Sequence, residues 1–506
     1  MKKKLISIAL IPILCLYSFL GTNMLETKAG NMIPTDFFVT PESFGAEGDG
    51  VTDDTDAFQE MIASQYLNIQ LTAGKSYVIS DAVTIDGKKL NGNNANIIMK
   101  KSATSTAHFA FRVSGSTKLK NINFKLVNPS YDILNTDEDK SENKLMRSWY
   151  TVGIINGRDV VIEDCNFDSE DIEQGGLLDI YSDNRGVVVR GCNFDLNSQT
   201  TGGLYIRGGH NNGDTHSEDI IIEDCNIAGS SRDEVLAIWG WKNTLSNVTV
   251  KNCNIIHKKN SVKCTHLITL SGSGTVKDIN IEKCNIVAYN TNSSVIKDHH
   301  VTDEAAPNEN IQVNDCNIDI YSEMPLSNGI FNCEDAVVVN NCVVNDHTTT
   351  YRHSVSATAD KITFNNCDFR FDGVGFAYRG NFVNCKFVNN NSIDDSLIPT
   401  AFVRSASFTN CTFSNIAAKV FAQPLATTDK FIIKNSKFES NCNIIGSSFV
   451  LCSKDLETPV VIEGNDSLQK PINMPYQTTG SVSGNIFQTN TVGKTGSMTV
   501  GTNYFN

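Results

Sequence analysis

The sequence has few charged residues, no excess of basic residues and, after residue 20, no long apolar run. Charged side chains make up 19% of the 506 residues, below the usual quarter, which argues against long solvated helices and coiled coils. The formal net charge of −14 argues against a general nucleic-acid binder, which needs a basic face. No later stretch is apolar enough to cross a membrane. Hydrophobic residues at 40% still allow a large core.

The long apolar segment at the amino terminus is typical of a secretory signal peptide. Three lysines at positions 2–4 precede the apolar run from Leu5 to Leu20, and Thr27-Lys28-Ala29 forms a cleavage site. We therefore predict a signal peptide over residues 1–29, a secreted protein and no membrane contact after cleavage. An uncleaved membrane anchor is the alternative.

A short motif recurs through the middle of the chain at intervals of 18 to 33 residues. Each copy has alternating β-branched or aromatic residues, two polar residues, a cysteine, a polar residue and then Phe, Ile or Val, as in Ile220–Ile227. The copies centre on Cys165, Cys192, Cys225, Cys253, Cys284, Cys316, Cys342, Cys367, Cys385 and Cys411. Ser436 continues the series.

This repeat indicates a coil of short strands. The alternation is typical of strands, and Asn and Asp lie where the chain must turn, because Asn tolerates left-handed backbone conformations. Almost no segment has an apolar stripe of period 3.6, which excludes helical repeats, and the units are too short for four-stranded propeller blades. We therefore predict an all-β, single-stranded parallel β-helix whose coils stack about 4.8 Å apart.

The cysteines mark this scaffold. Fourteen of the 15 come after the predicted signal peptide, and an even number in a secreted protein can form disulfides. Ten cysteines at one position of the coil instead indicate a buried column of unpaired thiols. Some pairing between neighbouring rungs is the alternative. Regular Cys-x-x-Cys spacing is absent, so we predict no metal site among them.

A glycine-rich loop and one helix start precede the coils. The loop runs from Phe44 to Thr55 and leads into a helix beginning near Asp56, whose free amides Asp53 or Asp54 can cap. A calcium loop formed by Asp49, Asp53 and Asp54 is the alternative interpretation, although it lacks EF-hand spacing.

The segment over residues 44–62 closely resembles the amino-terminal motif of the pectate-lyase-like superfamily of right-handed parallel β-helix proteins. With the Cys-Asn coils, the resemblance covers roughly residues 40–440. It implies a right-handed, pectin-lyase-like β-helix with a short amino-terminal capping helix. The superfamily includes lyases, polygalacturonases, other polysaccharide hydrolases and phage tailspikes, and a shared fold does not determine the chemistry.

The expected organisation is one elongated solenoid. The signal peptide occupies residues 1–29, the β-helix with its amino-terminal cap residues 30–440, and the last coils with a cap or association segment residues 441–506. A monomer or a homotrimer is expected, since tailspike relatives form trimers.

Candidate site residues lie in the middle coils. Aligning the coils on the Ile or Leu that ends each strand stacks Ile180, Ile206, Ile238 and Leu270. The positions four residues earlier include Glu234 and His266 on consecutive rungs, with Asp233 beside them. The positions one residue later are Tyr181, Arg207, Trp239 and Ser271. The alignment therefore predicts that Glu234 neighbours His266 and that Arg207 neighbours Trp239.

These residue types suit polysaccharide cleavage. Hydrolysis of a glycosidic bond uses one carboxylic acid to protonate the leaving oxygen and a second carboxylate to activate water or attack the sugar, and Asp233 and Glu234 offer this pair. Trp239 and Tyr181 offer surfaces for sugar rings, and Arg207 can bind a carboxylate. The structural alternative is a solvated Asp-Glu turn beside a core histidine.

Three segments resemble motifs of the polygalacturonase family. Arg232–Ile238 resembles its Gly-Asp-Asp-Cys-Ile-Ala-Ile segment, Thr265–Ser273 its Gly-His-Gly segment with the subsequent Ser-Ile-Gly-Ser, and Val295–Lys297 its Arg-Ile-Lys. The resemblance implies that Asp233 is the general acid and that Glu234 positions the water. It also implies that His266 tunes the acid and that Lys297 binds substrate.

The chain departs from that family at three positions. Thr200-Thr201-Gly202 stands where the family has Asn-Thr-Asp, Glu234 replaces the second Asp, and Val295 replaces the substrate-binding Arg. Arg207 can replace the lost positive charge, and Asp179 is a stand-in for the lost carboxylate.

These residues are compatible with three functions. The first is a polysaccharide hydrolase that needs no cofactor or metal. The second is a uronan lyase in which Arg207 is the base and Ca²⁺ is held by carboxylates such as Asp179 and Asp183. The third is a carbohydrate-binding solenoid without activity. Inserted loops over residues 126–150 and 291–310 are expected to wall either a cleft or a binding groove.

Overall fold

The computed structural model describes these residues: 37–102, 105, 107–127, 149–170, 175–197, 203–209, 215–230, 234–241, 243–259, 263–300, 307–322, 324–356, 361–377, 379–391 and 398–505. The predicted signal peptide over residues 1–29 and the predicted acid Asp233 lie outside them.

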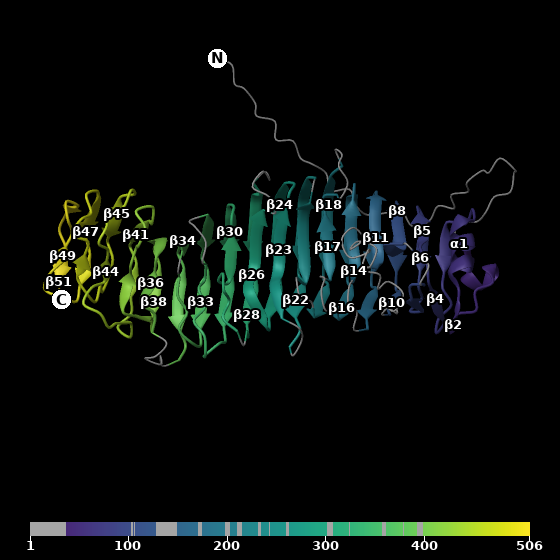
Figure 1. The fold of residues 1–506 in the computed structure, drawn as a ribbon, viewed down its shortest axis with the longest axis horizontal. Coiled ribbons are helices and arrows are strands. Elements are labelled where there is room, and N and C mark those ends of the chain that lie inside the picture. The colour runs from purple at the N-terminus through teal and green to yellow at the C-terminus, as the bar shows by residue number, and fades with distance from the viewer. Residues whose placement is uncertain are drawn as a thin grey trace, which may run out of the picture.

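The chain winds into a long solenoid in which each full coil gives one strand to each of three parallel sheets (Figure 1). β14 (Gly175–Ser182), β15 (Arg185–Arg190) and β16 (Asn193–Asn197) make one such coil, and β17 (Leu204–Arg207) then pairs with β14 in parallel. Since strands of successive coils pair in register through all three sheets, the fold is a parallel β-helix of the pectin-lyase-like type. The predicted fold class is confirmed.

Sheet I carries the candidate site. Its nine strands are β5 (Val83–Asp86), β8 (Phe109–Gly115), β11 (Trp149–Gly157), β14, β17, β20 (Leu236–Trp241), β23 (Cys264–Gly272), β26 (Thr291–His300) and β29 (Phe331–Cys333). Towards the carboxyl end of the chain, a five-stranded sheet replaces sheet I in the coils. Its strands are β36 (Ala401–Val403), β40 (Val420–Ala422), β44 (Val450–Leu451), β46 (Ile472–Asn473) and β49 (Gly493–Lys494).

Sheet II comes after sheet I in each coil. Its eighteen strands are β1 (Phe38–Val39), β3 (Asn68–Gln70), β6 (Lys89–Asn91), β9 (Lys118–Lys120), β12 (Val161–Glu163), β15, β18 (Ser217–Glu223), β21 (Leu245–Lys251), β24 (Val276–Glu282), β27 (Glu309–Asn314), β30 (Val337–Asn340), β32 (Ile362–Asn365), β34 (Arg379–Val383), β37 (Ser405–Thr409), β41 (Phe431–Lys434), β45 (Val460–Glu463), β47 (Gly480–Ser483) and β50 (Thr499–Val500).

Sheet III completes the coil. Its fifteen strands are β2 (Asp49–Asp53), β4 (Ser76–Ile79), β7 (Asn96–Met99), β10 (Asn123–Leu126), β13 (Asn166–Ser169), β16, β19 (Asn226–Ser230), β22 (Asn254–His257), β25 (Asn285–Ala288), β28 (Asn317–Ile320), β31 (Val343–Asp346), β33 (Asp368–Phe371), β35 (Lys386–Asn389), β38 (Thr412–Ser414) and β42 (Lys437–Phe438). Two strand pairs remain: β39 (Ala417–Ala418) with β43 (Asn443–Ile444), and β48 (Ile486–Phe487) with β51 (Tyr504–Phe505).

The turn from sheet II to sheet III explains the recurrent motif. The residue before each column cysteine is in most coils an Asn or Asp with a left-handed backbone, such as Asp224 at φ 55° and Asn252 at φ 52°. Asn and Asp adopt this conformation more readily than other residues with a Cβ. Asparagines after the cysteines also bond from coil to coil, as Asn226 Nδ2 donates to Asn193 Oδ1 at 2.8 Å. Turns and ladders together account for the recurrent asparagines of the motif.

The thiol column is present and unpaired. All fourteen cysteines between Cys165 and Cys452 are buried and free of disulfides. In the column each thiol lies within hydrogen-bonding distance of backbone carbonyls. Cys225 Sγ is 3.2 Å from Glu223 O and 3.7 Å from Val189 O of the preceding coil, and its one S–H can donate to either. The prediction of an unbonded column is therefore confirmed.

The column changes its chemistry towards the carboxyl end. Ser436 takes the cysteine position, and its Oγ accepts the Cys411 N–H at 3.1 Å. Asn465, Asn485 and Asn503 occupy the next coils, and Asn485 Oδ1 accepts the Asn465 N–H at 3.0 Å. Sheet II continues through these coils to β50, beyond residue 440.

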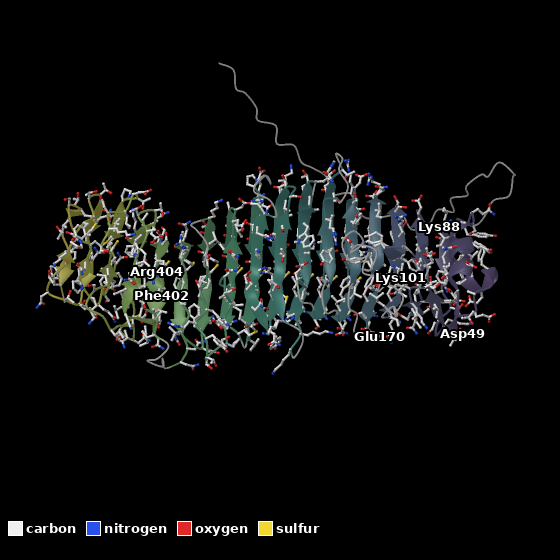
Figure 2. The ribbon with its side chains drawn as sticks, viewed as in Figure 1. Asp49, Lys88, Lys101, Glu170, Phe402 and Arg404 are labelled. Carbon is white, nitrogen blue, oxygen red and sulfur yellow. The ribbon has the colours of Figure 1, made fainter. Side chains whose placement is uncertain are left out.

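A short helix covers the first coil. α1 (Thr55–Ala63) comes after the 3₁₀ turn η1 (Pro41–Phe44) and turns Phe58 and Met61 into the core, at the end of the molecule where Asp49 lies (Figures 1 and 2). Asp53 Oδ1 accepts the Thr55 N–H at 3.1 Å, whereas Asp54 turns away from the helix and accepts the Glu47 N–H at 2.7 Å.

The alternative calcium loop gains no support from this region. Asp49 accepts the Val51 and Thr52 amides at 2.8 and 2.7 Å, so each acidic side chain bonds a different part of the loop. Within the described ranges, no three His, Cys, Asp or Glu side chains are grouped so that they could hold a metal ion.

Two further expectations concern loops and membranes. The inserted loop expected over residues 291–310 is wrong for its first part, because Thr291–His300 pair in parallel with β23 and form β26. The loop over 126–150 falls mostly outside the described residues. None of the helices that the structure describes is both long and apolar enough to span a bilayer.

Candidate functional site

The outer face of sheet I brings the candidate residues together rung by rung. Ile206 pairs with Ile180 on one side and Ile238 on the other, and Ile238 pairs with Leu270. The alignment made from the sequence is therefore correct. Arg207 pairs directly with Trp239, as expected.

Arg207 and Asp179 form a buried ion pair on this face. Arg207 Nε lies 3.2 Å from Asp179 Oδ1, and only 6% of Arg207 is exposed. Burial raises the pKa of Asp179 to about 6, while the facing guanidinium opposes the rise. The pair links two rungs, because Asp179 stands in register with Tyr205, two residues before Arg207.

Aromatic rings enclose the guanidinium. The Arg207 Cζ lies 4.4 Å from the Tyr205 ring centroid, 5.4 Å from Trp239 and 5.8 Å from Tyr181. Tyr150 is 6.0 Å away, and its hydroxyl accepts from Arg207 Nη2 at 3.3 Å. Such cation–π contacts strengthen when desolvated. Arg207 is thus built into the wall of the site, and Trp239 and Tyr181 stay half-buried at its surface.

Glu234 lies just before β20 and is held by an aromatic hydroxyl. The Tyr205 hydroxyl donates to Glu234 Oε1 at 3.0 Å, and 6% of Glu234 is exposed. The same tyrosine therefore stacks on Arg207 and orients Glu234.

His266 lies in β23 of the next coil, two residues before Ile268, just as Glu234 lies two residues before Leu236. Leu236 and Ile268 are register partners. Val235 N donates to Leu267 O at 3.1 Å, which joins the segments that carry Glu234 and His266. His266 Nδ1 is 2.7 Å from Ser294 Oγ on the following coil. Burial lowers the pKa of His266 to about 3, with the Lys297 charge adding to the effect, so the ring is neutral near neutral pH.

Lys297 stands on β26 between carboxylates of different coils. Burial lowers its pKa, while the charges of Glu334 and Glu234 oppose that shift. Its register partners are Thr269 and Asn332. Lys297 is therefore a partly desolvated cation on the same sheet as the site, and the Glu234 charge acts on it.

Sequence reasoning missed four residues of this face: Tyr150, Tyr205, His299 and Glu334. His299 pairs in register with Ser271, and its Nε2 lies 3.3 Å from Ser271 Oγ. Burial, together with the Lys297 charge, lowers the pKa of His299 to about 4. Continuing the coil alignment beyond Leu270 by two coils would have found His299 and Glu334, because Asp298 and Cys333 continue the stacked position.

Two expectations about carboxylates have different outcomes. Asp233 lies outside the described residues, so its role stays a prediction. Asp183, a candidate calcium ligand, pairs with Arg158 at 2.9 Å and so has a cation as its partner.

Comparisons with known proteins give short or distant likenesses. No protein-family model matches the chain. A stretch of 69 residues is 39% identical to a capsule-specific depolymerase of a Klebsiella phage, and the match covers 12% of this chain and 9% of that protein.

Solved structures that are similar over most of the chain include a phage tailspike and a polygalacturonase. The tailspike protein of E. coli bacteriophage HK620 matches 85% of this chain and 83% of its own, with 10% identity and a TM-score of 0.48. An exopolygalacturonase from Thermotoga maritima matches 76% of this chain and 93% of its own, with 11% identity and a TM-score of 0.44.

Proposed function

We propose that this protein is a secreted polysaccharide-degrading enzyme that hydrolyses glycosidic bonds on the outer face of sheet I. The observation that carries the proposal is the oriented Glu234 carboxylate, held by the Tyr205 hydroxyl at 3.0 Å, with a charge that acts on Lys297 of β26. A carboxylate with a neighbouring cation suits general acid–base chemistry on a sugar bond. The stretch similar to a capsule-specific depolymerase is consistent with a polysaccharide substrate.

In the proposed mechanism, Asp233 protonates the leaving oxygen, and Glu234 positions the attacking water and accepts its proton. Lys297 binds the substrate, and Trp239 and Tyr181 carry sugar rings. His266 acts as a neutral hydrogen-bonding group, because its low pKa keeps it uncharged near neutral pH. Arg207 and Asp179 support the aromatic wall, which is formed by the rings of Tyr150, Tyr181, Tyr205 and Trp239. No metal or cofactor takes part, and the protein acts as a monomer or a homotrimer.

The second candidate function is binding without cleavage. The burial of Glu234 and His266, at 6% and 7% exposure, favours it, since neither group is open to solvent. A lyase that uses Arg207 as base with Ca²⁺ is a further proposal, although the ion pair and rings around Arg207 leave it poorly placed to take a proton.

The test is activity on a panel of acidic and neutral polysaccharides. We expect new reducing ends without the ultraviolet absorbance of unsaturated sugars, and no effect of EDTA. Glu234→Gln should lower kcat by about 100-fold or more, since positioned acid–base groups contribute roughly that much. The amide keeps the size of the side chain and its acceptor oxygen for Tyr205.

Glu60→Gln is the matched control, because Glu60 is an exposed carboxylate on the capping helix α1. It should keep full activity. Equal activity of Glu234→Gln and the parent protein would exclude Glu234 from the chemistry. Retarded migration in glycan gels without any product would establish the binding function instead.

A further inference from the structure

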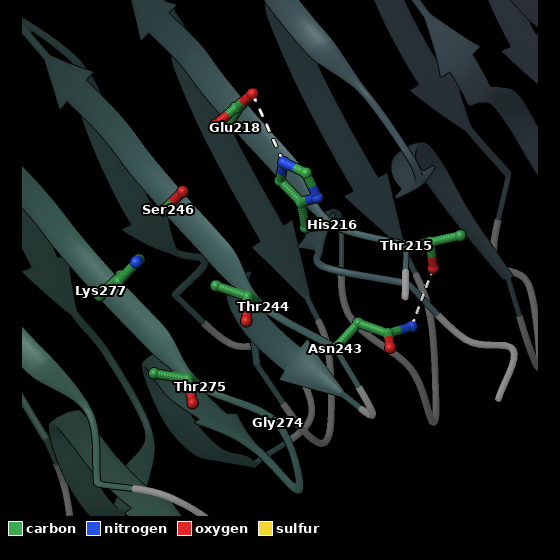
Figure 3. Close-up of a pocket in the computed structure, with 9 residues that line it drawn as sticks. All are labelled: Thr215, His216, Glu218, Asn243, Thr244, Ser246, Gly274, Thr275 and Lys277. Atoms are coloured by element: carbon green, nitrogen blue, oxygen red, sulfur yellow. Dashed lines mark hydrogen bonds and ion pairs between the residues drawn. The ribbon is translucent and has the colours of Figure 1, made fainter. Parts of the chain in front are cut away.

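A second polar recess lies where sheet I turns into sheet II (Figure 3). We call it the corner pocket. It has a volume of about 500 Å³, within the range of ligand pockets. It is formed at the starts of β18, β21 and β24 and by the turns before them. Its lining residues are Thr215, His216, Glu218, Asn243, Thr244, Ser246, Gly274, Thr275 and Lys277.

Close packing of successive turns forms the floor of the corner pocket. A Cβ on Gly274 would lie 2.3 Å from Asn243 O, and one on Gly240 would lie 2.9 Å from the Gly274 carbonyl. Neither position can carry a larger side chain without moving backbone. The glycines let the turns stack tightly, so the side chains that line the pocket stand above them.

The lining suits a polyhydroxylated ligand. Four hydroxyl groups, from Thr215, Thr244, Ser246 and Thr275, lie beside the Asn243 amide. Asn243 Nδ2 already donates to Thr215 Oγ1 at 2.9 Å, which holds both side chains in place. Hydroxyls both donate and accept, as the hydroxyls of a sugar do.

The pocket lining contains one acidic residue, Glu218, and one lysine, Lys277. Arg185 Nε lies 3.2 Å from Glu218 Oε1, so the acidic residue of the pocket is paired. His216 also contacts Glu218, at 3.5 Å. Lys277 has no ion pair within the part of the chain that the structure describes, and its register partner on β27 is Glu309. In a chain of net charge −14, its ammonium is a local cation that a ligand carboxylate can pair with.

The corner pocket comes shortly after β20 in the chain, and β20 carries Trp239 of the candidate site. Trp239 lies at the site and Asn243 lines the pocket, four residues further on. A fully extended chain of that length spans at most about 14 Å, which a short oligosaccharide can cover.

We propose that the corner pocket binds an acidic sugar residue of the polysaccharide that is cleaved on sheet I, with Lys277 pairing to its carboxylate. The proposal rests on the proposed function for its substrate class. It makes the enzyme specific for glycans that carry a uronic acid at a fixed distance from the cleaved bond.

Binding is measured by affinity electrophoresis of the full chain in gels containing polygalacturonate or, separately, neutral dextran. All variants carry Glu234→Gln so that the polymer stays intact. Lys277→Ala should lower the affinity for polygalacturonate, calculated from the retardation in the gel, about tenfold, which is the effect of one charge-assisted hydrogen bond. The affinity for dextran should stay unchanged. Lys277→Arg should restore most of the affinity.

Lys386→Ala removes the same charge from an exposed position on β35 and should have no effect. The proposal is overturned if Lys277→Ala binds polygalacturonate as its parent does, if Lys386→Ala weakens binding equally, or if dextran binding falls in parallel. If no polysaccharide is hydrolysed but Lys277→Ala still loses polygalacturonate selectively, the pocket assignment holds and only the hydrolase function fails.

Discussion

At the scale of single residues, the Arg207–Asp179 pair stands out because both partners are buried. A guanidinium stays protonated in proteins, whereas a buried carboxyl can take up a proton. The two partners therefore differ in what happens when the other is removed. The pair is a structural support for the aromatic wall and, through Tyr205, for Glu234.

Removing Asp179 and removing Arg207 should destabilise the fold by different amounts. Asp179→Asn leaves a buried cation without a counter-charge and should cost about 3 kcal/mol. Arg207→Met leaves a carboxyl whose pKa burial already raises to about 6, so the folded state holds a proton more tightly than the unfolded chain. The free energy of unfolding of the Arg207→Met variant should therefore be greatest near pH 4 and should fall as pH rises through 6.

Urea unfolding of both variants at acidic and at slightly alkaline pH measures this difference. Asp183→Asn, which breaks the more exposed Arg158–Asp183 pair, is the control and should cost less than about 1 kcal/mol. Equal losses for Asp179→Asn and Arg207→Met at pH 5 would show that Asp179 does not take up the proton.

At the scale of elements, charged side chains tie strands of sheet II together on the outside of the solenoid. Glu163 on β12 contacts three cations of the neighbouring strands: Lys118 at 2.8 Å, Lys120 at 2.9 Å and Arg190 at 3.1 Å. Hydrogen bonds from Lys118 and then Lys120 lower the pKa of Glu163 to about 2.

Glu163→Gln should therefore make the protein less sensitive to acid. A lowered carboxyl pKa contributes stability that is present above about 4.5 and is lost as pH falls towards 2. The variant should be about 1 kcal/mol less stable at neutral pH, a value reduced for solvent screening, and equal to the parent near pH 2. Unfolding free energies across this range measure the effect, and a parallel offset at every pH would contradict it. Glu309→Gln should leave the profile unchanged.

At the scale of the whole molecule, the periodic features of the sequence predicted the scaffold. The cysteine position, the turn asparagines and the stacked Ile206 and Ile238 all repeat once per coil, so aligning coils gave the true register. The pairing of Arg207 with Asp179 escaped prediction because it runs diagonally between rungs. The burial of Glu234 could not be predicted either, because Glu234 lies in the turn before β20 and the repeat does not describe the conformation of that turn.

The column at the turn into sheet III changes from thiols to amides. We therefore predict that substitutions in the thiol part and in the amide part of the column have different effects on stability. Asn485 is fully buried, its Nδ2 donates to Ile462 O at 2.8 Å, and its Oδ1 accepts Asn465 N–H. Asn485→Ala leaves these buried groups unpaired and should cost about 2–4 kcal/mol. Cys284→Ala loses only weak thiol bonds and should cost about 1 kcal/mol.

Because each coil contacts only its neighbours, the loss from Asn485→Ala should stay near the carboxyl end. Amide hydrogen exchange should speed up in β45, β47 and β50 and stay unchanged in β18 and β21, whereas Cys284→Ala should alter exchange mainly in β21, β24 and β27. A uniform increase along sheet II in either variant would show that the solenoid opens as one cooperative unit. In that case a weakness in the last coils would reach the candidate site on sheet I, and the amide column would be a determinant of activity as well as of the carboxyl end.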